Sequence, residues 1–129
     1  MLQRLAGAIA EMEGFYKPRS VPQRLNNPGD LMFAHQRKAV PHSIVGSDNK
    51  VRIYAEFPTI EDGWEALYRQ IRLDASRGLT ISQFIHKYAP ADDGNNPRSY
   101  TAYVCRRLGV GKDSLLSSLL PDQAAISTT

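Results

Sequence analysis

The chain is 129 residues long, and 42% of its residues are hydrophobic and 22% are charged. A chain of this length makes one ordinary domain and can bury a core without disulfides or metal ions, and its composition excludes wholesale disorder. No apolar run approaches the roughly 20 residues that cross a bilayer. Arg4, Glu11 and Glu13 interrupt the N-terminus, so no secretory signal is expected. The one cysteine, Cys105, cannot form an internal disulfide.

The charge balance is mildly basic, with 16 Lys and Arg against 13 Asp and Glu and an isoelectric point near 9.2. That balance favours anionic partners in general, including nucleic acid, anionic lipid and bacterial cell wall. A dedicated nucleic-acid binder would cluster its cations in a stripe, whereas the densest groups here are the pairs Arg37-Lys38 and Arg106-Arg107. No nucleic-acid partner is therefore expected.

Apolar residues at helical spacing predict an amphipathic helix over residues 2–13, and Gly14 suits a left-handed stop directly after it. Glu13 then lies on the last turn, where the carbonyl end of the helix disfavours a negative charge and favours the protonated carboxyl group. A carboxyl group that is protonated near neutral pH is what general acid catalysis requires. Glu13 is thus a candidate general acid, and its alternative role is that of a surface carboxylate near a helix end.

Residues 15–30 are rich in turn formers and show no periodicity, and a loop of this length in a small domain is uncommon unless it is functional. Residues 31–33 and the alternating run 51–57 flank a polar stretch that contains residues 46–49. These two apolar segments predict a small antiparallel hairpin.

Three further helices are predicted at residues 59–78, 80–90 and 96–109, because each begins at a capping residue and ends at a glycine or proline. Asp113 is expected to cap a last apolar turn at residues 115–120. A helix, a long loop, a hairpin and several short helices in this order predict an α+β fold that is mostly helical.

The sequence offers little support for a zinc site, a calcium site or a reactive cysteine. His35, His42 and His86 are accompanied by no cysteine pair and no second histidine at ligand spacing, which argues against zinc. Residues 92–96 look like a calcium loop but lack its alternating ligands and closing glutamate, so a turn followed by a helix cap explains them better. Cys105 is expected in the core. Neither a metal nor a cofactor is expected.

Three segments together resemble the lysozyme-like superfamily, in particular its soluble lytic transglycosylase and phage-associated branch. The first contains Glu13-Gly14-Phe15 and residues 26–32 (NNPGDLM). It is similar to a family segment in which a catalytic glutamate ends a helix and a Gly-Leu-Met type motif follows after a loop. The others are residues 54–67 and residues 84–100, which are similar to an aromatic-acidic stretch and to a Tyr-Ala-Pro stretch of phage members. The resemblance covers roughly residues 6–108.

The resemblance implies a lysozyme-like fold, with a cleft between a hairpin lobe and a helical lobe, that acts on peptidoglycan. Glu13 would protonate the bridging oxygen of the β-1,4 bond between N-acetylmuramic acid and N-acetylglucosamine, so that this bond is cut without metal or cofactor. In a lytic transglycosylase the same glutamate then acts as base and yields a 1,6-anhydro product. In a hydrolytic muramidase, or endolysin, a second carboxylate takes part. Asp30 stands where relatives usually have Asn, so it is either that carboxylate or a turn residue.

Roles are also expected for five further residues, and all of them except Met32 have a structural alternative. Tyr88 would hydrogen-bond and orient Glu13, or pack in the core. Asn27 and Met32 belong to the loop motif and would contact substrate, although Asn27 is also a turn former. Tyr54 and Tyr100 would stack on sugar rings, or pack half-buried.

The expected organisation is one catalytic domain, residues 1–121, with a flexible tail at residues 122–129. We expect a monomer that acts on the bacterial cell wall and is delivered by a phage particle, a holin or a secretion machine. The mild positive charge suits a polyanionic wall. A different function is also open: a lysozyme-like scaffold that binds the wall, or builds a phage particle or secretion apparatus, without catalysis.

Overall fold

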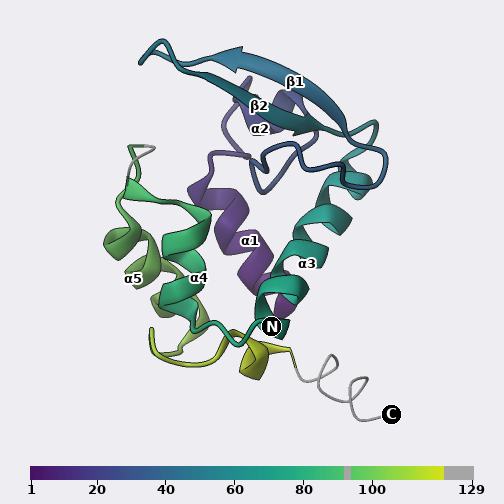
Figure 1. Ribbon diagram of the computed structural model, residues 1–129. Helices are drawn as coiled ribbons and strands as arrows, with labels where there is room; N and C mark the ends of the chain where they lie inside the picture. Colours follow the sequence, from purple (N-terminus) through teal and green to yellow (C-terminus); the bar gives the residue numbers. More distant parts are fainter. Residues whose placement is uncertain (92–93, 121–129) are drawn as a thin grey trace. The chain divides into compact units, whose positions relative to one another are not determined.

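The computed structural model describes residues 1–91 and 94–120. About half of the described chain is helical, and one small antiparallel hairpin is present, which confirms the predicted α+β class (Figure 1). The predicted tail at residues 122–129, and Asp92 and Asp93 of the calcium-like stretch, lie outside the described residues. In chain order the elements are α1 (Leu2–Met12), α2 (Val21–Arg24), β1 (Val40–Val45), β2 (Val51–Glu56), α3 (Ile60–Ser76), α4 (Ile81–Tyr88), α5 (Pro97–Leu108) and the 3-10 helix η2 (Leu116–Leu119).

The chain divides into two compact units. One contains Met1–Ala8 and the described residues from Arg69 onward, and the other is Ile9–Tyr68. The boundary between them falls inside α1 and inside α3, so each of these helices contributes residues to both units. We call them the helical unit and the hairpin unit.

The hairpin unit contains the antiparallel pair β1–β2, in a register that runs from Val40 opposite Glu56 to Val45 opposite Val51. Residues 31–33 pair with the other edge of β2, through hydrogen bonds of 2.9 Å on either side of the Met32–Tyr54 bridge. The predicted pairing of residues 31–33 with 51–57 is therefore present. The main partner of β2, however, is residues 40–45, which were placed in the polar stretch.

Pro41 explains why β1 was not predicted. A proline inside an apolar run argues against a central strand, because its nitrogen cannot donate to the ladder. Here Pro41 lies opposite Ala55, whose N–H donates to Leu31 on the other edge of β2. The nitrogen of Pro41 therefore faces outward, and the strand forms with no ladder bond lost.

A short helix interrupts the predicted loop at residues 15–30. Ser20 caps α2, its hydroxyl accepting a hydrogen bond from the Gln23 N–H at 3.3 Å, and Pro22 occupies the first turn. Proline suits that position because the first N–H groups of a helix have no partner within it. The prediction of loop throughout 15–30 is wrong at this turn, whose signal is the serine followed by proline.

Apolar side chains from the loops, β2 and α3 form the core of the hairpin unit. The ring of Phe15 packs edge-on against that of Trp64, with centroids 5.7 Å apart. The buried hydrophobic residues of this unit are Ile9 and Ala10 of α1 together with Phe15, Leu25, Leu31, Ala55, Phe57 and Leu67. The start of α3 is capped as predicted, because Thr59 Oγ1 accepts a hydrogen bond from the Asp62 N–H at 3.1 Å.

In the helical unit, α4 and α5 pack side by side (Figure 1). The predicted capping box of Thr80 and Gln83 opens α4 with both of its hydrogen bonds formed. Asn96 caps α5, and Gly109 ends it at a φ of 70°. The predicted cap at Asp113 is wrong: η2 begins after Leu115 and has no side-chain cap, because backbone pairing of this segment with the chain before α4 positions it instead.

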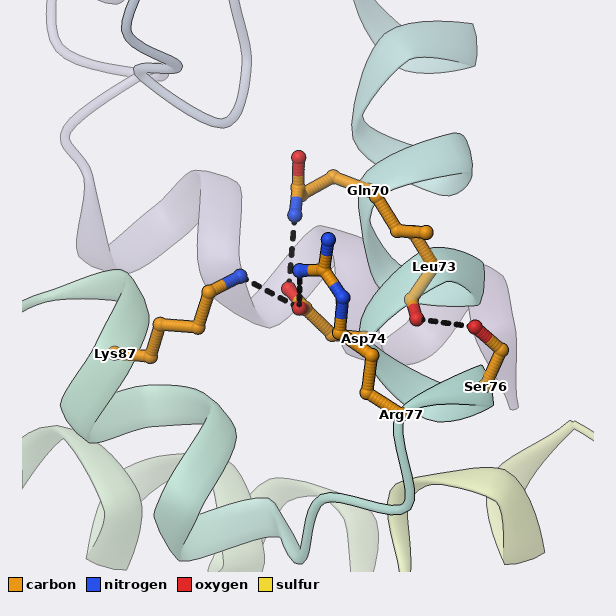
Figure 2. A network of polar contacts seen from close by, with 6 residues as sticks. All are labelled: Gln70, Leu73, Asp74, Ser76, Arg77 and Lys87. Carbon is orange, nitrogen blue, oxygen red and sulfur yellow. Dashed lines mark hydrogen bonds and ion pairs between the residues drawn. The ribbon is translucent and has the colours of Figure 1, made fainter.

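Asp74 is the centre of a polar network that joins α3 to α4 (Figure 2). Its side chain is 1% exposed and accepts hydrogen bonds from Gln70 at 2.9 Å, Arg77 at 3.0 Å and Lys87 at 2.6 Å. Burial raises the pKa of this carboxyl, but the contacts with Lys87, Gln70 and Arg77 outweigh burial and hold the pKa below its usual value. Both carboxylate oxygens of Asp74 are hydrogen-bonded, so the network has a structural role.

Candidate functional site

Glu13 directly follows the last residue of α1. Its N–H donates to the Ile9 carbonyl at 2.9 Å, which continues the hydrogen-bond pattern of the helix, and Gly14 then turns the chain with a φ of 80°. The glycine is required there because side chains disfavour that backbone conformation. Glu13 is half-buried. The expected placement of a carboxyl group at the carbonyl end of the first helix is thus present.

Five of the seven predicted site residues belong to the hairpin unit. They are Glu13, Asn27, Asp30, Met32 and Tyr54. The other two, Tyr88 and Tyr100, belong to the helical unit. The hydrogen bond expected between Tyr88 and Glu13 stays a prediction.

Asn27 fixes the loop that follows α2. Its side chain is fully buried, its oxygen accepts from the Leu31 N–H at 2.8 Å, and its amide donates to the carbonyls of Leu31 at 2.9 Å and Ala55 at 2.8 Å. Both amide hydrogens are therefore used to hold the loop against β2. Of the two roles open to Asn27, this geometry supports the turn former rather than the substrate contact.

Gly63 allows the same loop to lie directly against α3. A β-carbon at this position would lie 1.9 Å from the carbonyl oxygen of Asn26 and 2.8 Å from Pro28. Asn26 also donates from its side chain to the Phe57 carbonyl at 3.1 Å. The loop is thus held on one side by β2 and the residue after it, and on the other by α3.

Asp30, on the same loop, carries a largely buried carboxyl group with a raised pKa. Its N–H donates to the Asn27 carbonyl at 3.0 Å and closes a turn, and its backbone adopts a φ of 50°. Its Oδ1 atom is buried and has no hydrogen-bond partner among the described residues. Burial raises the pKa of Asp30 to about 6. Buried polar atoms are nearly always paired with protein or with water, so this carboxylate oxygen is a position at which water or a ligand can bind.

Met32 and Tyr54 lie directly opposite each other and share one face of the sheet. Met32 is 48% exposed, and Tyr54 is half-buried. The register places His42 of β1 opposite Tyr54 on the same face, where its Nδ1 atom lies 3.0 Å from Oε1 of Glu56. Sequence reasoning missed His42 because the strand that carries it was not predicted.

The two predicted site tyrosines of the helical unit, Tyr88 and Tyr100, differ in exposure. Tyr88 is half-buried, and its ring centroid lies 5.4 Å from that of Phe84. Tyr100 is 3% exposed within α5. Burial of this degree supports core packing for Tyr100 rather than stacking on a sugar ring.

The described residues contain no group of three His, Cys, Asp or Glu side chains able to hold a metal ion. No helix in the described part of the chain is long and apolar enough to span a membrane. Comparisons of the chain with protein-family models, with curated proteins and with solved structures found no match. A functional assignment therefore depends on the residues of the hairpin unit and their chemistry.

Proposed function

We propose that this protein has a lysozyme-like fold and cleaves the glycan strands of peptidoglycan, with Glu13 as the general acid. The observation that carries the proposal is a half-buried carboxyl group held at the carbonyl end of α1, in the same compact unit as the fixed loop of Asp30. The carbonyl end of a helix disfavours the charged carboxylate and so favours a group that can give up a proton. We choose peptidoglycan as the substrate because residues 13–15 and 26–32 resemble lytic transglycosylases.

In the proposed reaction Glu13 donates its proton to the oxygen that bridges N-acetylmuramic acid and N-acetylglucosamine. The bond between that oxygen and the anomeric carbon breaks as the sugar gains oxocarbenium character. In a lytic transglycosylase the Glu13 carboxylate then takes the proton of the muramyl 6-hydroxyl, whose oxygen bonds to the anomeric carbon. The product is a 1,6-anhydro sugar, and no water is consumed.

One observation favours hydrolysis as a second candidate function. The unpaired buried oxygen of Asp30 can accept a proton from water, and a pKa of about 6 leaves its carboxyl group mostly ionised at pH 7 yet still basic enough to be effective. Water activated by Asp30 would bond to the anomeric carbon and give a reducing end. In this muramidase, Glu13 keeps its role as the acid.

Replacement of the acid tests the proposal. Glu13→Gln should abolish the release of soluble muropeptides from purified peptidoglycan while leaving the far-ultraviolet circular dichroism spectrum unchanged. Glu11→Gln, which alters an exposed carboxyl group of α1, is the matched control and should retain activity. Activity that survives Glu13→Gln would remove Glu13 from the reaction. Binding to sacculi with no product from the wild-type protein would identify a non-catalytic wall-binding component.

Mass spectrometry of the released fragments separates the two chemistries. Anhydro-muramyl ends identify a lytic transglycosylase, and reducing ends identify a muramidase. If Asp30 activates water, Asp30→Asn should lower the yield of reducing ends about 100-fold or more, the usual contribution of a general base. An unchanged product distribution in Asp30→Asn would leave Asp30 as a turn residue only.

A further inference from the structure

A row of side chains crosses one face of the sheet in the hairpin unit. Met32 lies opposite Tyr54, and Tyr54 lies opposite His42, so the three side chains point to the same face. Glu56 follows Tyr54 by two residues along β2 and therefore shares that face. We call these four residues the Tyr54 row.

Solvent reaches the Tyr54 row. Met32 is 48% exposed, and the side chains of His42 and Glu56 are each 40% exposed. Met32 thus offers apolar contact area beside an aromatic ring and two polar groups, and in ligand sites apolar area provides affinity while a few polar atoms fix orientation.

The polar half of the row offers hydrogen-bond acceptors. Nδ1 of His42 lies 3.0 Å from Oε1 of Glu56, and a proton on Nδ1 shared with this carboxylate leaves Nε2 as an acceptor. The second oxygen of Glu56 is also an acceptor. Within the described residues, neither side chain has another hydrogen-bond partner. A ligand rich in O–H and N–H donors would complement this pair.

The arginine on this face has an acidic partner. Arg52, on the same face of β2 as Glu56, forms hydrogen bonds of 3.2 Å and 2.9 Å with the two oxygens of Asp48. A binder of polyanions would instead present a cluster of cations without such partners. The face therefore suits an uncharged ligand with many hydroxyl groups.

We propose that the Tyr54 row binds an N-acetylated sugar of the glycan strand and that His42 and Glu56 determine its specificity. The acetamido methyl group contacts Met32 and Tyr54, while sugar O–H and N–H groups donate to Nε2 of His42 and to Glu56. This inference rests on the proposed function, because it takes the glycan strand as the ligand. Its new element is the His42–Glu56 pair, which joins β1 to β2 and neither member of which was a predicted site residue.

Binding of an N-acetylglucosamine oligomer to the non-cleaving Glu13→Gln protein tests the inference by titration calorimetry. His42→Ala and Met32→Ala in that background should each weaken binding about three- to tenfold, the effect of losing one hydrogen bond or a comparable apolar contact. Glu56→Gln, which keeps an acceptor oxygen, should weaken binding less than Glu56→Ala. Ser43→Ala and Val51→Thr change exposed residues of the opposite face and should bind as the parent does.

The outcomes separate this inference from the proposed function. Equal affinities in the row variants and the opposite-face controls would overturn the inference, as would no binding by the parent protein. Peptidoglycan cleavage by the wild-type protein, measured in parallel, would leave the proposed function standing in either case. Binding that depends on the row, without any cleavage by the wild-type protein, would overturn the proposed function and support the inference.

Discussion

The carbonyl oxygen of Asn26 occupies the space that a side chain at Gly63 would need, 1.9 Å from the ideal position of a β-carbon there. Asn26 belongs to the loop that carries Asp30, and Gly63 belongs to the first turns of α3. The loop therefore keeps its position only if residue 63 has no side chain.

Gly63→Ala should destabilise the protein by about 3 kcal/mol, because the β-carbon displaces a backbone carbonyl rather than a flexible side chain. Gly7→Ala is the matched control. Gly7 lies in α1, and a β-carbon there would have no neighbouring atom within 4 Å, so alanine should stabilise that helix by about 0.5–1 kcal/mol. Urea denaturation measures both. A Gly63→Ala protein as stable as the wild type would show that the loop can move away from α3.

Removal of the Asn27 side chain should destabilise the protein by about 3 kcal/mol or more. Asn27→Ala leaves the Leu31 N–H and the Ala55 carbonyl without their buried partner, and each such group contributes about 1–3 kcal/mol. The Leu31 carbonyl loses one of its two hydrogen bonds and keeps the one from the Ala55 N–H. Asn27→Asp keeps the acceptor for Leu31 but loses both donors, and it should destabilise as well. Denaturation midpoints measure these effects, and a loss below about 1 kcal/mol in both variants would contradict the role of Asn27 in holding the loop.

The sequence predicts the features that local chemistry determines. The cap at Thr80 and the glycine stops at Gly14 and Gly109 are confirmed, because each depends on residues within one turn of a helix. Contacts between distant segments escaped prediction. The bond from Asn27 to Ala55 joins residues 28 positions apart, and no local pattern indicates it. The strand that carries His42 was missed for a local reason, because Pro41 argues against a strand.

The Asp74 network should make stability fall in acid. The contacts with Lys87, Gln70 and Arg77 hold the folded pKa of Asp74 below its unfolded value, so the stability it contributes is present above about pH 4 and is lost as the pH falls through the folded pKa. Asp74→Asn should lower the free energy of unfolding at pH 7 by about 1–3 kcal/mol, with a smaller difference at about pH 2. Asp113→Asn, at an exposed position, should change little. Equal losses at both pH values would contradict this account.

Asp30 should have the opposite pH dependence. Burial raises its folded pKa to about 6, above its unfolded value, so the folded state holds the proton more tightly and stability falls as the pH rises from about 4 through 6. A shift of about two units corresponds to about 3 kcal/mol. Asp30→Asn removes the charge and tolerates the same backbone conformation, so it should be more stable than the wild type at pH 7 by up to about that amount and equal to it near pH 3.

Urea denaturation of Asp30→Asn across this pH range measures the difference. A gain in stability at pH 7, together with a loss of reducing-end products, would show that the buried carboxylate is kept for chemistry at the expense of stability. A variant that is less stable than the wild type at pH 7 would instead show that the Asp30 carboxylate stabilises the turn. In that case the unpaired oxygen could no longer be explained as a site prepared for a ligand.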